Sequence, residues 1–235
     1  MADVLTRPVR ALVRATPTTR ILRLDLEGAP LAFRAGQVAL IGSHGHADRR
    51  PYSIASSPED AQRHGRLEFL LRVDAGGDAG FHLADLHVGR KIDLEGPFGA
   101  FTLPEPTDAA GFLFVAGGTG IAPLRSMVRH LVARGETRPI SVLYSARTPD
   151  EFAYGAELRK LSRAGCLTLM LTVTGEASDA WGGARGRIGM THLAAALPSR
   201  EALAFVCGPP ALVDDVPPLL LKLGASASRI RIEEW

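Results

Sequence analysis

One segment near the middle of the chain sets its architecture: Val115-Ala116-Gly117-Gly118-Thr119-Gly120-Ile121-Ala122-Pro123. The continuous apolar run 112–116 predicts a buried strand, and Pro123 suits the first turn of a following helix. Glycines between a strand and a helix let a phosphate approach the backbone closely, so this arrangement is typical of nucleotide binding. The residues expected to contact a dinucleotide here are Gly117, Gly118, Thr119 and Gly120.

Strands and helices alternate from this segment onward. Periodicity predicts helices over 123–134, 153–164, 191–196 and 210–223, and strands over 140–144, 167–173 and 204–207. Apolar strands that alternate with amphipathic helices form parallel sheets with helices on both faces. We therefore predict a doubly wound parallel α/β domain over residues 109–235.

The residues before this domain show a different pattern. Short strands separated by turn residues are expected within 9–26, 37–41, 67–73 and 91–95, with one helix near 81–86. Strands at this spacing favour a small antiparallel β-barrel or sandwich. The proline-rich polar segment 103–108 marks the end of this N-terminal domain, which we place over residues 1–104.

Composition argues against several classes of function. The chain has 235 residues, 46% of them hydrophobic, and a net charge of +2 without a long basic run, so nothing favours nucleic-acid binding. No stretch of about eighteen apolar residues predicts a membrane span, and no signal-peptide core precedes the strands, so we expect a cytoplasmic protein. Cys166 and Cys207 are too few for a disulfide framework or an iron–sulfur cluster. The histidines form no metal-ligand pattern, so no metal site is expected.

A second candidate site is the segment Arg50-Pro51-Tyr52-Ser53. The Arg50 guanidinium can bind a phosphate through two hydrogen bonds, as a side chain that is always charged. Tyr52 can lie against a flat ring, and the Ser53 hydroxyl can bond a polar ring edge. The alternative interpretation is a strand end that carries an arbitrary surface arginine.

A third segment, Cys207-Gly208-Pro209-Pro210, follows a predicted strand and so belongs at the same carboxyl edge as the Gly117 turn. In order and spacing, the three segments resemble the ferredoxin–NADP reductase family, and the resemblance covers essentially the whole chain. It implies a flavin-binding antiparallel β-barrel followed by a nicotinamide-binding α/β domain. It also implies FAD as the cofactor, with FMN less favoured, and NADH or NADPH as the substrate.

The resemblance implies a flavin site in the N-terminal domain. Arg50 would bind the pyrophosphate, Tyr52 the isoalloxazine and Ser53 the ring edge where hydride arrives. A glycine turn, Gly76-Gly77-Asp78-Ala79-Gly80, would add backbone amides, although the family has a hydroxyl residue where this chain has Gly80. That substitution and the charge of Asp78 weaken the expected affinity. The implied flavin-binding residues are Arg50, Pro51, Tyr52, Ser53, Gly76, Gly77 and Gly80, with Arg72 and Val73 on the adenine side, where a buried strand explains them equally well.

The resemblance also implies a nicotinamide site. Cys207 would lie beside the nicotinamide, next to Gly208 and Pro209, and Thr119 would reach the region where nicotinamide meets flavin. Glu233-Glu234-Trp235 resembles the family's Glu-x-aromatic ending, in which the glutamate bonds near the hydride-transfer centre and the aromatic ring covers the flavin. The catalytic assignments are Ser53, Cys207 and Glu233, and Trp235 is assigned to the flavin. A buried structural cysteine and a short solvated tail are the alternatives.

The choice between dinucleotides depends on arginines near the adenosine end. Ser145 and Arg147 follow the second strand of the domain and can bind a 2′-phosphate. The family's NADP-selective Ser-Arg pair aligns with Thr174-Gly175, which lacks the arginine. Arg185 and Arg187 lie near enough in sequence to replace it. The sequence slightly favours NADH.

These features predict an FAD-dependent NAD(P)H oxidoreductase that passes electrons to a separate ferredoxin, flavodoxin or iron–sulfur oxygenase component. One alternative is a reductase of free flavin or quinone, in which flavin is a substrate. A second is an electron-transfer subunit of a larger complex without independent turnover. A third is a flavin-sensing or structural protein with no turnover.

Overall fold

The computed structural model describes residues 4–74 and 76–235, apart from the side chain of Phe81. The chain forms two compact units. The first comprises the residues up to Leu103 together with Arg125–Arg134, and the second comprises Pro104–Leu124 together with Gly135–Trp235. The linear boundary at 104–109 stays a prediction, because the first unit also takes in a segment from beyond it.

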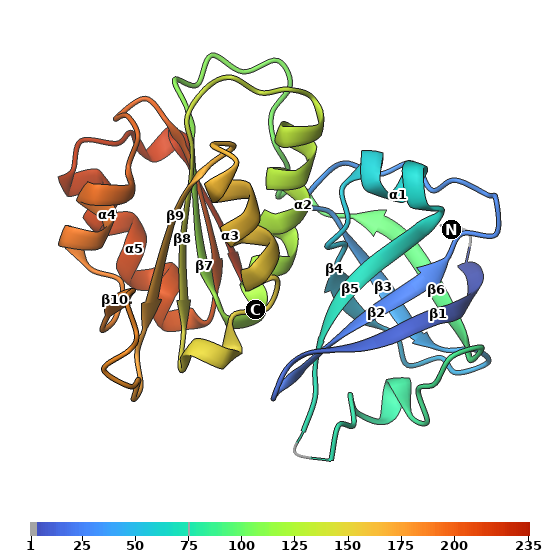
Figure 1. Cartoon of the computed structure of the whole chain (residues 1–235). Helices are drawn as coiled ribbons and strands as arrows, with labels where there is room; N and C mark the ends of the chain where they lie inside the picture. Colours follow the sequence, from blue (N-terminus) through green and yellow to red (C-terminus); the bar gives the residue numbers. More distant parts are fainter. Residues whose placement is uncertain (1–3, 75) are drawn as a thin grey trace. The chain divides into compact units, whose positions relative to one another are not determined.

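The first unit is built on a six-stranded antiparallel sheet in the order β4-β3-β6-β1-β2-β5. Its strands are β1 (Val4–Thr16), β2 (Thr19–Asp25), β3 (Val38–Ser43), β4 (Arg50–Ser53), β5 (Arg66–Arg72) and β6 (Lys91–Phe98) (Figure 1). Ile54, just after β4, bridges Phe69 of β5, so the two edge strands meet. The sheet thus closes on itself, which confirms the predicted antiparallel barrel.

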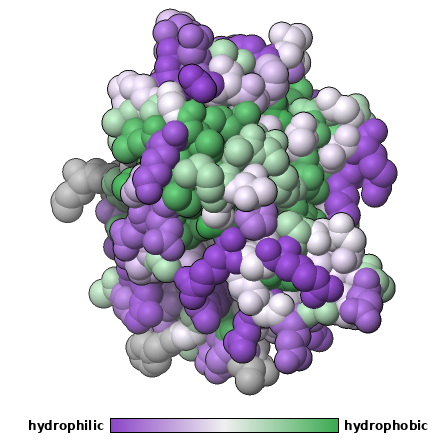
Figure 2. Space-filling model, turned by 90° about the vertical axis from the view of Figure 1, so that its left-hand side faces the viewer, coloured by the Kyte–Doolittle hydropathy of each residue, from purple (hydrophilic) through white to green (hydrophobic). Residues whose placement is uncertain are grey.

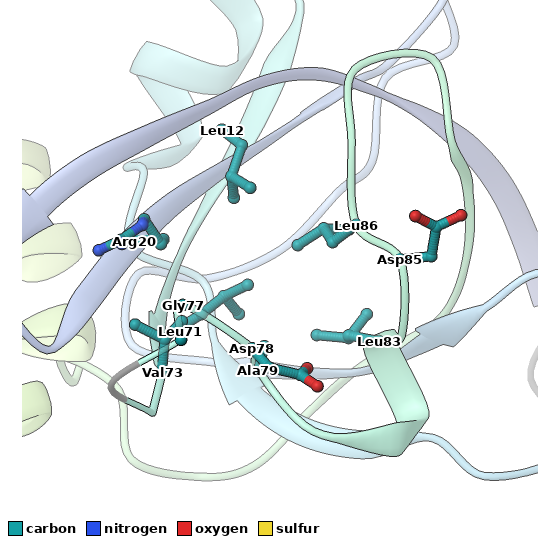
Figure 3. A pocket seen from close by; sticks show the side chains of 11 residues that line it. Leu12, Arg20, Leu71, Val73, Gly77, Asp78, Ala79, Leu83, Asp85 and Leu86 are labelled. Atoms are coloured by element: carbon teal, nitrogen blue, oxygen red, sulfur yellow. The ribbon is translucent and has the colours of Figure 1, made fainter.

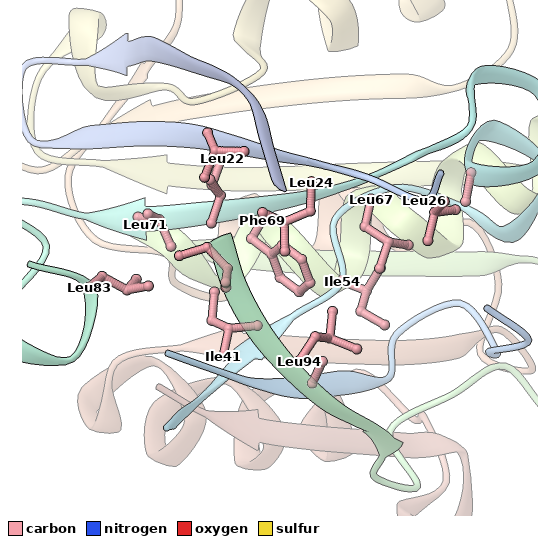
Figure 4. Close-up of a cluster of buried hydrophobic side chains, with 14 residues drawn as sticks. Leu22, Leu24, Leu26, Ile41, Ile54, Leu67, Phe69, Leu71, Leu83 and Leu94 are labelled. Carbon is pink, nitrogen blue, oxygen red and sulfur yellow. The ribbon is translucent and has the colours of Figure 1, made fainter. Parts of the chain in front are cut away.

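The barrel encloses a hydrophobic core. Leu22 and Leu24 on β2 are buried, as are Leu67, Phe69 and Leu71 on β5. Side chains two residues apart share one face of a strand, so this spacing turns them all inward. Figure 4 shows them pointing toward one another from different strands. Truncating Phe69 to alanine would cost about 3–5 kcal/mol of folding free energy.

The helices of the first unit differ from the prediction. The helix expected near 81–86 is only a short 3₁₀-helix, Phe81–Leu83. Gly80 and Asp85 on either side have positive φ angles, which an α-helix excludes.

An α-helix that the prediction missed, α1, spans Pro58–His64. The Ser57 side chain caps it by accepting a hydrogen bond from the Asp60 amide, and Gly65 ends it in the left-handed conformation.

The segment 125–134 is held in the first unit by polar contacts. Arg129 Nε donates to Asp60 Oδ2 at 2.7 Å, and Arg125 donates to the Ala55 carbonyl, also at 2.7 Å. Ser126 donates to the Ser56 carbonyl at 2.7 Å. Burial raises the pKa of Asp60, but the Arg129 hydrogen bonds and charge outweigh burial and hold it below its usual value. The pair is therefore ionised at neutral pH.

The second unit contains a six-stranded parallel sheet in the order β10-β9-β8-β7-β11-β12. Its strands are β7 (Phe112–Gly117), β8 (Ile140–Ala146), β9 (Thr168–Val173), β10 (Ala184–Arg185), β11 (Leu203–Gly208) and β12 (Ile230–Glu234). The helices are α2 (Ile121–Ala133), α3 (Gly155–Arg163), α4 (Met190–Ala196) and α5 (Pro210–Lys222). The doubly wound sheet is confirmed, whereas β10 and β12 were not predicted.

Each face of the parallel sheet packs against different elements. Helices α4 and α5 lie on one face and α3 lies on the other (Figure 1). Val115 of β7 and Val206 of β11 belong to the core beneath α4 and α5. Their neighbours alternate to the opposite face, where Phe114 lies 5.5 Å from Phe205 between ring centroids. Cys207 follows Val206 and therefore also points to that face.

The side of the molecule that carries α4 and α5 has exposed apolar side chains. Figure 2 shows hydrophobic residues gathered over part of this side. Exposed large hydrophobic residues on these helices include Met190 and Leu221. Within the described ranges, no helix combines the length and apolar character that crossing a membrane would require.

Candidate functional site

The predicted flavin segment forms strand β4 of the first unit. Antiparallel pairing with β3 sets Ser53 opposite Val38 and Arg50 opposite Ile41. Exposure falls along the strand: Arg50 and Pro51 are exposed, Tyr52 is half-buried and Ser53 is buried. The Arg50 guanidinium is therefore open to solvent, as binding a phosphate requires. The Ser53 hydroxyl lies toward the interior, as a bond to a ring edge requires.

A histidine that sequence analysis did not single out lies against this segment. The Tyr52 hydroxyl and His82 Nε2 are 2.8 Å apart, and the two ring planes differ by 16°. Burial raises the pKa of Tyr52 and lowers that of His82, and the Arg50 charge lowers both. Tyr52 and His82 thus form a polar pair, although thirty residues separate them and no sequence signal joins them. Arg50 lies 3.6 Å from the Asp48 carboxylate.

Two amides of the glycine turn 76–80 already donate hydrogen bonds to carboxylates in the turn or just before it. The Asp78 amide donates to Asp74 Oδ1 at 2.9 Å, and the Gly80 amide donates to Asp78 Oδ1 at 2.8 Å. A phosphate that binds the Gly80 amide must displace the Asp78 carboxylate. The weaker flavin affinity stays a prediction, and this hydrogen bond is a structural reason to expect it.

The same turn lines a cavity of about 220 Å³ in the first unit. Its lining includes Gly76, Gly77 and Val73 of the predicted flavin set and the apolar side chains Leu12, Leu71, Leu83 and Leu86. Figure 3 shows Arg20, Asp78 and Asp85 around these leucines. Arg72, the neighbour of Val73, is exposed and does not line the cavity.

In the second unit, the glycine turn 117–120 lies against the end of β11. A Cβ atom on Gly120 would collide with the Cys207 carbonyl oxygen, and one on Gly117 would lie 2.9 Å from Pro209 Cδ. Gly118 has a φ of +54° and open space beside it. The two predicted segments, 117–120 and 207–209, are therefore packed together at one sheet edge.

Cys207 and the chain's last strand complete this edge. Cys207 pairs in register with Glu233 of β12, and the Trp235 amide donates to the Gly208 carbonyl at 3.0 Å. Cys207 is fully buried. Burial and the Glu233 charge raise the pKa of the Cys207 thiol far above its usual range. Cys207 is thus a neutral thiol. Glu233 and Glu234 belong to β12, and the exposed Trp235 that follows is tied to β11 by its backbone amide.

The predicted adenosine residues lie further along the same edge. Ser145 of β8 pairs with Gly117 of β7, and Arg147 follows as an exposed residue. Arg185 donates to the carbonyls of Ala177 and Ser178 at 3.0 and 2.9 Å. Its guanidinium is therefore engaged by the loop 174–183.

Both cofactor assignments fit observations of this structure. In the second unit, the open space beside Gly118 and the tight packing at Gly117 and Gly120 match a backbone that a dinucleotide phosphate approaches. In the first unit, Arg50 supplies an exposed cation beside Tyr52, and His82 Nδ1 is buried without a hydrogen-bond partner among the described residues. An anionic flavin would find both a charge and a hydrogen-bonding nitrogen there.

Two protein-family models match the chain. Residues 8–103 match the oxidoreductase FAD-binding domain, and residues 114–217 match the oxidoreductase NAD-binding domain. The two matched segments follow one another as the barrel and the parallel sheet do.

Curated relatives and solved structures agree with these matches. The chain is 30% identical to ferredoxin–NADP reductase B of Sorangium cellulosum, with 99% of this chain and 95% of the relative covered. It is also 30% identical to the propane 2-monooxygenase reductase component of Rhodococcus jostii, with 99% of this chain and 64% of the relative covered. A ferredoxin NADP⁺ reductase from Neisseria gonorrhoeae, solved with FAD and NADP, shares the fold at a TM-score of 0.83 and 22% identity, covering 100% of this chain and 99% of that one. The chain spans less than two thirds of several monooxygenase reductase components that it matches.

Proposed function

This chain belongs to the ferredoxin–NADP reductase family, and from that premise we propose that it carries electrons from NAD(P)H through FAD to a separate one-electron acceptor protein. The acceptor would be a ferredoxin, a flavodoxin or an iron–sulfur oxygenase component. The names of its relatives, which include oxygenase reductase components and a ferredoxin–NADP reductase, support this class of partner. The cytoplasmic location expected from the sequence is part of the same proposal.

One observation carries the proposal: three segments far apart in the sequence meet at one carboxyl edge of the parallel sheet. The turn 117–120 packs against Cys207 and Gly208, and Glu233 lies beside Cys207 in the register of β11 and β12. Ligands bind at the carboxyl ends of parallel strands in open α/β sheets. A glycine turn for phosphate, next to a buried thiol and a carboxylate, suits a nicotinamide dinucleotide.

In the first unit, we assign Arg50 to the flavin phosphates and Tyr52 and Ser53 to the isoalloxazine. The cavity beside the glycine turn is assigned to the adenine end of FAD, because Val73 and Gly76 line it and its leucines offer an apolar surface for a flat ring. This assignment favours FAD over FMN, which has no adenine to place there.

FAD bound to Arg50, Tyr52 and Ser53 would supply the chemistry of hydride acceptance and single-electron release. The residues around the dinucleotide act by position. Cys207 stays a protonated thiol, so it neither attacks nor abstracts a proton. Cys207, Thr119 and Glu233 would hold the nicotinamide in place, and exact placement of reacting groups supplies much of the rate of such a step.

We propose NADH as the preferred dinucleotide. Arg185, which was expected to replace the missing arginine of the Thr174-Gly175 pair, donates to two loop carbonyls instead. The same loop carries Glu176 and Asp179, whose charges disfavour a 2′-phosphate. Arg147 and Arg187, both exposed, are then the other arginines that the sequence places on the adenosine side.

The test is a visible spectrum of the purified protein, followed by anaerobic titration with NADH and separately with NADPH. A bound yellow flavin that bleaches with NADH at lower concentrations than with NADPH supports the reductase and its preference. A colourless protein that consumes NADH only when free flavin is added indicates a flavin reductase. Bound flavin that neither dinucleotide reduces contradicts the proposal.

A further inference from the structure

His82 has a buried nitrogen that no described residue uses. The side chain is 2% exposed, and its Nε2 bonds the Tyr52 hydroxyl at 2.8 Å. The other ring nitrogen, Nδ1, has no hydrogen-bond partner among the residues that the structure describes. Buried polar atoms in native proteins are nearly always bonded, and an exception calls for a missing ligand or water.

The hydrogen bond between the Tyr52 hydroxyl and His82 Nε2 determines whether His82 Nδ1 is a donor or an acceptor. A neutral imidazole carries its proton on one nitrogen and accepts a hydrogen bond at the other. Burial raises the pKa of Tyr52, so the phenol keeps its proton, and burial with the Arg50 charge lowers the pKa of His82, despite opposing charges on Asp48 and Asp78. When the phenol donates to Nε2, the histidine proton lies on Nδ1, which is then a donor.

The surroundings of Nδ1 indicate what kind of acceptor it meets. A Cβ atom built on Gly80 would lie 3.4 Å from Nδ1, so this nitrogen lies beside the glycine turn at a position that bears no side chain. Arg50 lies two residues before Tyr52 on β4 and so on the same face of the strand, with its guanidinium 3.6 Å from the Asp48 carboxylate. A nearby cation, an N–H donor and a bare glycine backbone together suit an anion with several oxygens, which means a phosphate group.

We infer that His82 is a flavin-phosphate ligand: its Nδ1–H donates to a phosphate oxygen of FAD or FMN, and the Tyr52 hydroxyl fixes the required tautomer. This inference rests on the proposed flavin function and adds a residue to it. Tyr52 thereby has two roles, contacting the flavin ring and orienting His82. The histidine also compensates for the amide that Asp78 occupies in the adjacent turn.

The test compares three flavins on flavin-free protein: FAD, FMN and riboflavin, which has no phosphate. Flavin fluorescence gives the Kd of each for the wild type, His82→Phe, His82→Asn and the control His87→Phe, an exposed histidine in the same segment. His82→Phe should raise the Kd of FAD and FMN about tenfold and leave that of riboflavin within about twofold. His82→Asn should raise the Kd of FAD and FMN by a smaller factor, because the asparagine amide places a hydrogen-bond donor near the position of Nδ1. His87→Phe should bind all three flavins as the wild type does.

Two results would overturn the inference. If His82→Phe raised the Kd of riboflavin as much as that of FAD, the ring would only support the pocket. If the Kd of no flavin changed, His82 would not take part in flavin binding. Failure of the proposed function looks different, since the wild type itself would then bind no flavin or resist reduction by NADH.

A second measurement needs neither bound flavin nor activity. Long-range ¹H–¹⁵N correlation spectra of histidine-labelled protein report which ring nitrogen of His82 carries the proton. We expect the Nδ1–H tautomer in the flavin-free wild type and its partial loss in Tyr52→Phe. An Nε2–H tautomer in the wild type would contradict the inference. This measurement remains decisive if His82→Phe does not fold.

Discussion

The indole Nε1 of Trp235 donates a hydrogen bond to Glu233 Oε2 at 2.8 Å, so the two residues form a connected pair at the edge of the parallel sheet. Burial raises the pKa of Glu233, and the Trp235 hydrogen bond only partly opposes it. The carboxylate is thus less favoured in the folded protein than in the unfolded chain.

This pair predicts a pH-dependent stability difference. When folding raises the pKa of a carboxyl group, the folded protein loses stability as the pH rises from the ordinary pKa, 4.5 for glutamate, to the raised pKa. Glu233→Gln keeps an oxygen for Trp235 but removes the charge. The variant should therefore have a higher Tm than the wild type at pH 7, and the difference should vanish below pH 4.5. Thermal denaturation across this pH range measures it, and a lower Tm for the variant at pH 7 would contradict the argument.

Cys207→Ala should slow reduction of the bound flavin by NADH about tenfold, because we assign the thiol to positioning the nicotinamide and not to proton transfer. Stopped-flow absorbance under anaerobic conditions gives the rate constant. Cys166→Ala, which removes the other cysteine, should react at the wild-type rate. An unchanged rate constant in Cys207→Ala would mean that Cys207 is a structural cysteine.

Gly118→Ala should raise the KM for NADH about tenfold or more, since the new methyl group enters the open space assigned to the dinucleotide phosphate. Gly135→Ala is a matched control, because Gly135 also has a positive φ and open space around it. Both variants should lose about 1–2 kcal/mol of stability from backbone strain. Equal KM values in the two variants would contradict the assignment of the dinucleotide phosphate to this turn.

Leu86→Trp should weaken FAD binding about tenfold and leave FMN binding nearly unchanged, because the indole fills the cavity assigned to adenine. Fluorescence titration with both flavins tests this. An equal loss for FMN would show that the substitution distorts the glycine turn instead.

Asp78→Asn should tighten FAD and FMN binding about fivefold, as one charge about 4 Å from another in water contributes about 1 kcal/mol. Asparagine keeps an oxygen that can accept from the Gly80 amide, so the turn itself is retained. Asp85→Asn, elsewhere on the cavity lining, should change neither Kd. A weaker Kd in Asp78→Asn would mean that the carboxylate holds the turn in its binding conformation.

The architecture could be predicted because it depends on local patterns. Alternating leucines on β2 and the apolar run before Gly117 identify their sheets directly. Helix α1 was missed although its capping residue Ser57, Pro58 and the terminal Gly65 are all visible in the sequence. β12 was missed because its apolar and polar alternation covers only Ile230 to Glu233, and pairing with β11 makes these residues a strand.

The candidate site could be predicted only in part. The glycine turns and the Arg50 and Cys207 segments are contiguous motifs, so sequence alone names them. His82 is different, since its place depends on a barrel that brings Tyr52 and the segment after the glycine turn together. The occupied Gly80 amide likewise depends on the conformation of Asp78, which the sequence does not specify.

The inclusion of Arg125–Arg134 in the first unit bears on how the protein is made. A ribosome releases the chain from its N-terminus, so folding units normally mature in sequence order. Here the barrel obtains its Arg129–Asp60 contact only after β7 and the glycine turn of the second unit have been synthesised. Maturation of the two units therefore overlaps in time, and a fragment cut at residue 104 would lack part of its own first unit.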